Sequence, residues 1–292
     1  MIAPEQVQSP EAVARHYDEL DPFYREIWGA HVHHGYWATG QEAPHEAVEA
    51  LVDYLAHRLG FDPGQQVCDV GCGYGATALR LASQFGVQVS GITISRVQAK
   101  HASESTLDVE TVSIECGDWL RNTYPDEHFD RVYAIESSEH IDDKQRFFDE
   151  AYRTLRPGGR LGVYAWLARG RPHRWEVRYL LEPICREGRL PSMGSESEYR
   201  SLAVTAGFDI DEVEDLSRQV RRTWSICVYR VAVKLLTQSR YRRYITDKNA
   251  SNRVFALSLL RLLLAYRTGS MRYCLLIASK PAAGARMALP KE

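Results

Sequence analysis

The sequence predicts an α/β fold, with a parallel sheet covered by helices on both faces. Two observations carry this prediction. Short apolar strand patterns alternate with helical patterns over residues 46–166, and three closely spaced glycines, Gly71, Gly73 and Gly75, join the first strand to a helix. In such folds ligands bind beyond the carboxyl ends of the strands. The glycine run follows such an end, so we expect a ligand site there.

The individual elements are read from the spacing of their apolar residues. The expected strands cover residues 66–70, 87–91, 111–115, 129–135, 159–166, 209–215 and 273–280. The expected helices cover residues 46–60, 75–85, 95–105, 143–155, 195–206, 224–237 and 253–266. The short run R156-P-G-G159 predicts a break between a helix and the fifth strand, and residues 168–194 suggest a helical insertion.

Length and composition favour one globular domain that carries a lid. The chain has 292 residues, of which 45% are hydrophobic and 25% charged. No apolar run reaches the roughly 18 residues of a membrane span, and no signal or transit peptide is visible, so we expect a cytoplasmic protein. The expected regions are an N-terminal aromatic cover segment (1–45), a ligand-binding core (46–167), a lid with the final strands of the same domain (168–280), and a tail (281–292).

Charge is distributed unevenly. Residues 216–280 contain 14 Lys or Arg and one acid, Asp247, although the net charge of the whole chain is −2. This basic segment either lies against the acidic first half, is solvated, or faces an anionic ligand such as a prenyl diphosphate or an anionic membrane surface. No nucleic-acid recognition motif accompanies it, and the six cysteines lack metal-binding spacing. We therefore expect neither a nucleic-acid partner nor a metal, whereas peripheral membrane contact and a homo-oligomer remain open.

The glycine run V67-C-D-V-G-C-G-Y-G75 indicates which kind of ligand binds. Glycines let the backbone approach a ligand where a side chain would interfere. The spacing is G-x-G-x-G, whereas the dinucleotide fingerprint is G-x-G-x-x-G and holds a pyrophosphate at the helix N-terminus. Asp69 precedes the glycines, and a carboxylate at this strand end suits a cation better than a phosphate. The pattern therefore favours a cationic nucleoside over NAD.

With Gly91 closing the second strand and Asp118 and Trp119 following the third, the motifs resemble those of class I S-adenosylmethionine-dependent methyltransferases. The resemblance implies a Rossmann-like seven-stranded sheet with helices on both faces and a helical lid inserted before the last strand. It also implies S-adenosyl-L-methionine as the cofactor. The cofactor-binding residues would then be Asp69, Gly71, Gly73, Gly75, Thr93, Gln98, Asp118, Trp119 and Glu136.

One departure from that family narrows the resemblance. Most class I enzymes place an acid after the second strand, but here the chain reads G91-I-T-I-S-R-V-Q98. This form resembles the subgroup of tocopherol and sarcosine methyltransferases and cyclopropane-fatty-acid synthases, in which a Thr and a Gln contact the ribose end. The resemblance assigns that contact to Thr93 and Gln98. Alternatively, the segment serves only to cap the following helix through Ser95.

Candidate catalytic residues follow the fourth strand. Methyl transfer needs alignment of the acceptor and, for some acceptors, removal of a proton, for which His is suited near neutral pH. A His occupies the corresponding loop of related sugar and tocopherol methyltransferases, so we expect His140 to act as base or orienting group, with Glu139 as its partner. Tyr17 is a further candidate. The alternative for the Glu139 and His140 pair is a helix cap or surface pair ahead of Asp142.

The aromatic N-terminal segment supplies most of the expected acceptor contacts. The string Y24-R-E-I-W-G-x-H-x-H-H-G-Y-W37 resembles the opening of tocopherol methyltransferases, and the likeness continues from residue 11 to 281. The segment is too irregular for a simple core helix, and we expect it to fold over the ligand. Expected substrate-binding residues are Tyr24, His34, Tyr36, Trp37 and Trp166.

The function expected from the sequence is methyl transfer to a lipophilic small molecule, an isoprenoid or aromatic intermediate, with carbon as the favoured methylated atom. The alternatives are O- or N-methylation of a natural product such as a glycoside or alkaloid, and a non-catalytic binding protein that retains the fold. The glycine spacing argues against a dinucleotide-dependent oxidoreductase.

Overall fold

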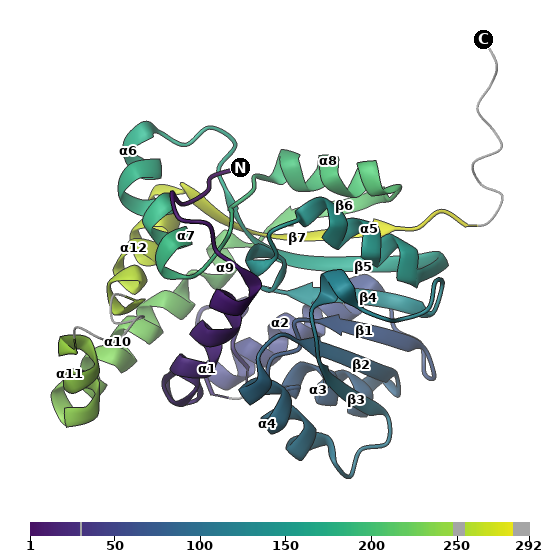
Figure 1. Ribbon diagram of the computed structural model, residues 1–292, viewed down its shortest axis with the longest axis horizontal. Coiled ribbons are helices and arrows are strands. Elements are labelled where there is room, and N and C mark those ends of the chain that lie inside the picture. The colour runs from purple at the N-terminus through teal and green to yellow at the C-terminus, as the bar shows by residue number, and fades with distance from the viewer. Residues whose placement is uncertain (30, 248–254, 283–292) are drawn as a thin grey trace.

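A computed structural model describes residues 1–29, 31–247 and 255–282 of the chain. At its centre lies a seven-stranded sheet with the strand order β3-β2-β1-β4-β5-β7-β6 (Figure 1). The strands are parallel except β7, which is antiparallel to both of its neighbours. Their bounds are β1 (Gln66–Val70), β2 (Gln88–Thr93), β3 (Val112–Cys116), β4 (Phe129–Ile135), β5 (Leu155–Ala168), β6 (Asp209–Asp215) and β7 (Met271–Ser279). The expected seven-stranded fold is confirmed.

The largest difference from the expected strands is at the start of β5. The strand begins at Leu155, four residues before the expected residue 159. Leu155 pairs with Phe129, and the ladder then shifts register before Arg160 pairs with Arg131. The run of Pro and Gly at residues 157–159 is therefore a bulge within β5 and does not separate the strand from the preceding helix.

The helices match the expected ones within a few residues, apart from α1, α9 and α11. Their bounds are α1 (Pro10–Ile27), α2 (Pro44–Leu59), α3 (Ala76–Phe85), α4 (Arg96–Thr106), α5 (Lys144–Thr154), α6 (Arg174–Glu176), α7 (Glu182–Glu187), α8 (Glu196–Ala206), α9 (Ser217–Val220), α10 (Arg222–Thr237), α11 (Ser239–Thr246) and α12 (Phe255–Thr268). A π-helical stretch (Val177–Leu181) joins α6 to α7, and short 3-10 turns cover Trp119–Arg121 and Ser138–His140.

The N-terminal segment is more regular than its sequence suggested. Residues 10–27 form one continuous helix, α1, whose first turn is capped by the Ser9 hydroxyl and carries Pro10 at its start. The expectation of an irregular segment was wrong because the polar residues that disturb its apolar pattern are buried and paired. His16 bonds to Tyr24, and Asp21 accepts a hydrogen bond from the Tyr74 hydroxyl.

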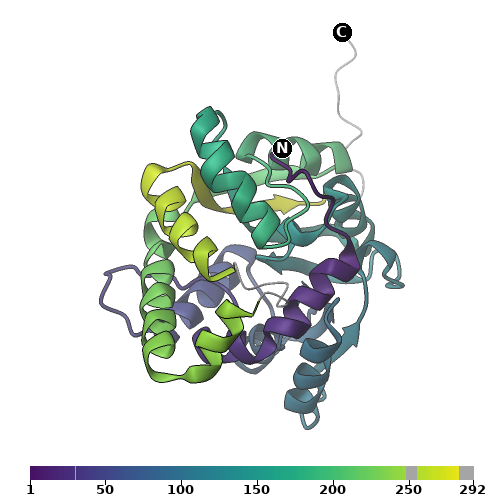
Figure 2. The same ribbon diagram turned by 60° about the vertical axis from the view of Figure 1, so that its left-hand side comes forward.

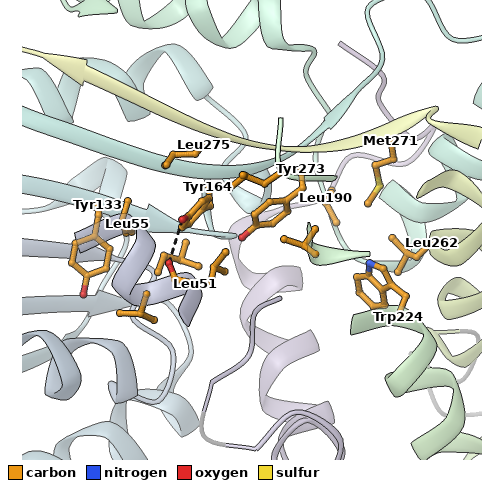
Figure 3. Packing of buried hydrophobic residues seen from close by; sticks show 14 of the residues in the cluster. Leu51, Leu55, Tyr133, Tyr164, Leu190, Trp224, Leu262, Met271, Tyr273 and Leu275 are labelled. Carbon is orange, nitrogen blue, oxygen red and sulfur yellow. Dashed lines mark hydrogen bonds between the residues drawn. The ribbon is translucent and has the colours of Figure 1, made fainter. Parts of the chain in front are cut away.

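Alternate side chains of the strands enter two apolar clusters, one on each face of the sheet. In β4, Tyr133 joins the cluster formed with α2 and α3, while its neighbours Val132 and Ala134 join the cluster formed with α5 and α8. Figure 3 shows the first cluster, in which the Tyr164 hydroxyl donates to the backbone oxygen of Leu51 at 3.2 Å. This cluster continues without a break into the helices that lie beyond the strand ends.

Those helices come from two insertions. One, α6 to α7, follows β5, and the other, α9 to α12, lies between β6 and β7. Figures 1 and 2 show α10, α11 and α12 along one flank of the molecule, with α1 between them and the sheet. The expected lid before the last strand is therefore present. Within the described ranges, no helix is both long and apolar enough to cross a bilayer.

The loop after β1 depends on Gly71 for a steric reason. Its backbone has a φ of +83°, and a Cβ at this position would lie 2.2 Å from the Cβ of Ser137. Ser137 itself is tied to the end of β1 by a short hydrogen bond to the backbone oxygen of Val70. The chain therefore needs glycine here both for its conformation and for the close approach of the loop that follows β4.

We expect the substitution Gly71→Ala to be strongly destabilising. The positive φ should cost about 1–2 kcal/mol, and the clash with Ser137 about 1–3 kcal/mol more. Gly64→Ala is the matched control, because Gly64 has the same φ of +83° but a Cβ there would meet no heavy atom within 4 Å. Urea unfolding of both variants measures the difference; equal losses would show that the contact with Ser137 carries no strain.

Candidate active site

A cavity lies beneath α1 at the carboxyl ends of β1, β2 and β4. It encloses about 830 Å³ of empty space, part of which is open to solvent. α1 contributes Val13 and Tyr17 to its wall, and the loop after β3 contributes Gly117. Of the residues expected to bind the cofactor, those that line this cavity are Gly71, Gly73, Thr93, Gln98, Asp118, Trp119 and Glu136.

The three glycines of the loop have different surroundings. Gly73 lines the cavity, and a Cβ on it would meet no heavy atom within 4 Å, so the added atom would occupy ligand space. Gly75 is not among the lining residues. It precedes α3 at a φ of +77°, and a Cβ there would lie 3.2 Å from the Cβ of Ala102 on α4. Gly75 is therefore placed to let two helices pack, and Gly73 to leave room for a ligand.

Asp69 lies at the inner end of this region. It lines an adjoining pocket together with Gly71, Gly73 and His31, and its side chain is only 3% exposed. Burial raises the pKa of Asp69 to about 7. Its Oδ2 atom has no hydrogen-bond partner in the described part of the chain. The Tyr133 hydroxyl interacts with this carboxyl and partly opposes the rise in its pKa, but a buried carboxyl with an oxygen still unbonded is the feature expected where a cationic amino group binds.

The opposite end of the cavity is held by local hydrogen bonds. The Thr93 hydroxyl donates to Gln98 Oε1 at 3.0 Å, and the indole N–H of Trp119 donates to the backbone oxygen of Phe147 at 3.2 Å. The Ser95 hydroxyl caps α4 by accepting from the Gln98 backbone N–H at 3.1 Å. The segment therefore both caps α4 through Ser95 and lines the cavity with Thr93 and Gln98, so the two alternatives do not exclude each other.

Helix α1 closes this cavity through polar contacts to two loops. Asp18 accepts hydrogen bonds from the Ser95 hydroxyl and from the Val97 backbone N–H at the start of α4. Asp21 accepts from the hydroxyl of Tyr74, which lies within the glycine run, at 2.8 Å. These two acids attach the N-terminal helix directly to the loops that surround the cavity.

A second, smaller cavity adjoins the first. It contains about 550 Å³ of empty space, part of which is open to solvent, and shares with the first cavity the residues Tyr17, Val32, Glu136 and His140. The rest of its described wall is aromatic or aliphatic apart from Ser258, and it includes no Lys or Arg: Tyr24, Trp28, Trp166, Ile184, Gly188, Leu190, Trp224, Ser258 and Leu262. This cavity suits an uncharged apolar molecule.

Tyr17 and His140 meet in the wall between the two cavities. The Tyr17 hydroxyl lies 2.9 Å from His140 Nε2, and the two rings are arranged edge to face with centroids 5.3 Å apart. Burial lowers the pKa of His140 to about 3 and raises the pKa of Tyr17. Both groups are therefore neutral at neutral pH, so the imidazole is available to accept a proton.

Glu139 does not pair with His140, which corrects the expected partnership. Its carboxylate accepts hydrogen bonds from the backbone N–H of Trp166 and from the Ser138 hydroxyl, and it lines neither cavity. Burial raises the pKa of Glu139 to about 8. The two residues are adjacent in the chain, but within the 3-10 turn Ser138–His140 their side chains have different surroundings. The residue that contacts His140 is Tyr17, not Glu139.

Glu136 is instead the carboxylate that borders both cavities. It accepts hydrogen bonds from the His34 backbone N–H at 2.7 Å, the Trp166 indole at 2.9 Å and the Tyr273 hydroxyl at 2.9 Å. His34 Nδ1 lies 2.9 Å from the same carboxylate. Burial opposes ionisation of Glu136, but the neighbouring His34 and the hydrogen bonds outweigh it and lower the pKa. A negative charge therefore sits where the cavities meet.

The residues expected to contact the acceptor divide into two groups. Tyr24 and Trp166 line the second cavity. His34 lies behind Glu136, Tyr36 stacks on Tyr54 with centroids 4.9 Å apart, and Trp37 borders a separate pocket, so these three do not contribute to the described wall. Lining residues that the sequence did not single out are Trp28, Val32, Ile184, Gly188, Leu190, Trp224, Ser258 and Leu262.

The missed residues carry only a weak signal in the sequence. Trp28 and Trp224 occur in segments that resemble tocopherol methyltransferases, and both are large aromatic residues outside the strands. Leu190 and Leu262 are indistinguishable by sequence from the core leucines around them. Their position becomes evident only when α7 and α12 pack together at the end of the sheet.

Comparison with known proteins agrees with this arrangement. Residues 5–256 match the family described as mycolic acid cyclopropane synthetase. The chain is 33% identical over 221 residues to 27-O-demethylrifamycin SV methyltransferase of Amycolatopsis mediterranei, covering 74% of this chain and 80% of that protein. It is also 33% identical to a probable chloroplastic tocopherol O-methyltransferase of Oryza sativa subsp. japonica, covering 73% of this chain and 64% of the relative.

Two solved structures extend the likeness over nearly the whole chain. The [4+2]-cyclase SpnF superposes with a TM-score of 0.82 at 27% identity, covering 97% of this chain and 98% of the other. A mycolic acid cyclopropane synthase complexed with SAH and CTAB gives a TM-score of 0.82 at 23% identity, covering 94% and 100%. At 23% identity, the likeness to the cyclopropane synthase shows that the two chains share a fold.

The cofactor that these relatives use fits the residues found in the first cavity. Asp69 offers an unpaired buried oxygen to an amino group, Gly73 leaves open space, and Thr93, Gln98, Asp118 and Trp119 border the far end. The sequence motifs, the seven-stranded fold and the matches to named methyltransferases lead to the same assignment. The chain belongs to the mycolic acid cyclopropane synthetase family of class I S-adenosylmethionine-dependent methyltransferases.

Proposed function

We propose that this enzyme methylates a neutral, lipophilic isoprenoid or aromatic acceptor that carries a hydroxyl group near the reacting atom, and that carbon receives the methyl group. The observation that carries the proposal is the second cavity, which is largely aromatic and meets the cofactor cavity at Tyr17 and His140. Trp28, Trp166 and Trp224 provide flat surfaces that suit a ring or a prenyl chain.

The lining of the second cavity argues against a negatively charged acceptor. A diphosphate needs basic side chains or a metal ion for its negative charge. The described wall has no Lys or Arg, and the described residues contain no cluster of His, Cys, Asp and Glu suited to a metal. The basic segment of the lid contributes Trp224, Ser258 and Leu262 to this wall, which are uncharged. We therefore place a hydroxyl group, and not a phosphate, at the reacting end of the acceptor.

His140 is the proposed proton acceptor. S-adenosyl-L-methionine supplies a methyl group on a positively charged sulfur, so the acceptor atom needs only to be aligned and made more nucleophilic. His140, neutral because its pKa is about 3, accepts at Nε2 the proton of the Tyr17 hydroxyl, while that hydroxyl takes the acceptor's hydroxyl proton in the same step; Nδ1 is buried and does not take part. A base with such a low pKa cannot hold that proton before the reaction begins. Proton removal therefore accompanies bond formation to the methyl carbon.

Tyr17 and Glu136 support this step in different ways. The Tyr17 hydroxyl passes the proton to Nε2, which lies 2.9 Å away, and also fixes the orientation of the imidazole. Glu136, held ionised by its donors, places a negative charge beside the reacting region and favours the positive charge of the bound cofactor. Loss of the acceptor proton serves methylation on oxygen and on an adjacent ring carbon alike, and a product NMR spectrum distinguishes the two.

A second candidate function is a cyclisation, because the [4+2]-cyclase SpnF has the same fold as this chain and is 27% identical to it. A cyclisation of that kind transfers no group and requires no base. The contact between Tyr17 and His140 at the junction of the cavities favours methyl transfer. Incubation with cofactor labelled in its methyl group separates the two, since only methyl transfer places the label in the product.

We expect His140→Gln and Tyr17→Phe each to lower kcat by about 10²–10⁴-fold, the range of a lost general base, because the proton passes through both residues. The dissociation constant for S-adenosylhomocysteine should change less than threefold in both. Tyr24→Phe is the matched control, because Tyr24 lies on the same helix and cavity wall but its hydroxyl contacts His16. Full turnover by His140→Gln would exclude this residue as the base.

We expect the affinity for S-adenosylhomocysteine to fall as the pH is lowered from 8 to 6. The pKa of Asp69 in the free protein is about 7, so below this pH the carboxyl must lose a proton before it can bind the amino group. Affinity should therefore fall by up to about tenfold per pH unit below 7. Burial holds the pKa of His31 at about 3, so His31 stays neutral throughout this range.

Calorimetric titration at several pH values measures this effect. Asp69→Asn should bind weakly at every pH and show a flat profile. Glu139→Gln is the control, because the pKa of Glu139 is about 8 and its titration overlaps the same range, yet its carboxylate lies outside the cavity wall. A pH dependence that persists in Asp69→Asn and disappears in Glu139→Gln would assign the titration to the wrong carboxyl and overturn the role of Asp69.

A further inference from the structure

Large apolar side chains gather on the outer surface of the lid. Most of the strongly exposed ones in the described chain lie on four neighbouring elements. They are Trp175 on α6, Tyr179 on the π-helical stretch, Tyr229, Val233 and Leu236 on α10, and Leu260 and Leu264 on α12, with exposed fractions from 37% for Val233 to 82% for Leu236. We call these seven residues the lid face.

Their spacing shows that each element presents one outward stripe. The pairs Trp175 with Tyr179 and Leu260 with Leu264 are four residues apart, the separation of neighbours on one side of a helix. The elements also pack in a row, with α10 against α12 and α12 against α7 and the π-helical stretch. Figures 1 and 2 show them along the same flank of the molecule.

Basic residues predominate around the lid face, where the acid Glu182, three residues after Tyr179, is paired with Arg186. Neither α10 nor α12 contains an Asp or Glu. Arg178, Arg222 and Arg267 are exposed on the same elements, and none of them forms an ion pair with an acid of the described chain. This surface is therefore both apolar and positively charged.

The inward-facing basic residues of the same helices behave differently. Lys234 lies 3.2 Å from Glu26 of α1, and Arg261 pairs with the buried Glu187 of α7 at 2.5 Å. These pairs account for part of the positive charge of residues 216–280 by packing it against acids of the body. Arg178, Arg222 and Arg267 are not neutralised in this way by acids of the described chain.

The lid face lies directly outside the proposed acceptor site. α10 contributes Trp224, and α12 contributes Ser258 and Leu262, to the wall of the second cavity. On the opposite sides of these two helices lie Tyr229 and Leu260. Two helices thus have one side on the cavity and one exposed apolar side, so little more than the thickness of a helix separates the cavity from the surroundings.

We propose that the lid face binds peripherally to an anionic lipid bilayer, with its apolar side chains inserted at the headgroup level and its arginines at the anionic headgroups. A helix face that combines apolar and basic residues binds such a surface by burial of apolar area together with electrostatic attraction. A second copy of the chain is a poorer occupant, because a symmetric dimer through this face would bring unpaired arginines of the same sign together.

Cosedimentation with vesicles tests this proposal without acceptor or cofactor, so its failure is distinct from a failure of the proposed activity. The full chain should bind vesicles of phosphatidylcholine with 30% phosphatidylglycerol at least tenfold more strongly than vesicles of phosphatidylcholine alone, because each arginine near an anionic surface contributes about one kcal/mol, or about fivefold in affinity. Salt screens this attraction, so 0.5 M NaCl should remove most of the difference. Arg178→Gln with Arg267→Gln should weaken binding by about tenfold or more.

Variants separate apolar insertion from charge. Leu260→Ser with Leu264→Ser should weaken binding by about tenfold or more, because two exposed leucines lose their apolar burial. Leu107→Ser with Val204→Ser is the matched control, since these residues are 79% and 57% exposed beyond α4 and on α8, away from the lid, and it should leave binding unchanged. Thermal melting checks that all variants fold equally well.

Three results would overturn the proposal. The first is equal binding to both vesicle types or to neither. The second is weakening by the Leu107 and Val204 control as large as that by the leucine pair of α12. The third is a concentration-dependent dimer in sedimentation velocity that Leu260→Ser with Leu264→Ser abolishes, which would make the lid face an interface between two copies.

Discussion

The structure depends on a carboxylate held in the nearly dry wall between two cavities. The side chain of Glu136 is 6% exposed, and its backbone has a φ of +54°, a conformation that non-glycine residues rarely adopt. An unpartnered carboxylate in such a place would cost several kcal/mol. Donors from His34, Trp166 and Tyr273 satisfy it. The N-terminal segment, β5 and β7 are therefore fixed relative to the end of β4 by one buried charge.

The features that sequence could predict are those in which one segment determines its own conformation. The alternation of strands and helices, and the three glycines after β1, are of this kind. Gly71 is needed for its positive φ, which depends on the local turn. Thr93 and Gln98 face the cavity because β2 ends there and α4 begins a few residues later. These two positions were expected from the resemblance to a methyltransferase subgroup, and the order of β2 and α4 along the chain explains why both face the cavity.

The features that sequence could not predict join residues far apart in the chain. Tyr17 meets His140 across 123 positions, whereas the adjacent Glu139 faces the backbone of Trp166. The irregular pattern of α1 has the same origin, since Asp21 and His16 are buried by partners that its own sequence does not reveal. Polar residues on a buried helix look like exposed loop residues until the contacts that satisfy them are known.

Helix α1 couples the two cavities mechanically. Through Asp18 and Asp21 it is bound to the loops around the cofactor cavity, and through Tyr17 it forms part of the wall of both cavities. Its Glu26 also pairs with Lys234 of the lid. Because one helix makes all of these contacts, a displacement of α1 would alter both cavities and the lid together. The hydrogen bonds of Asp18 and Asp21 are among the contacts that such a displacement would break.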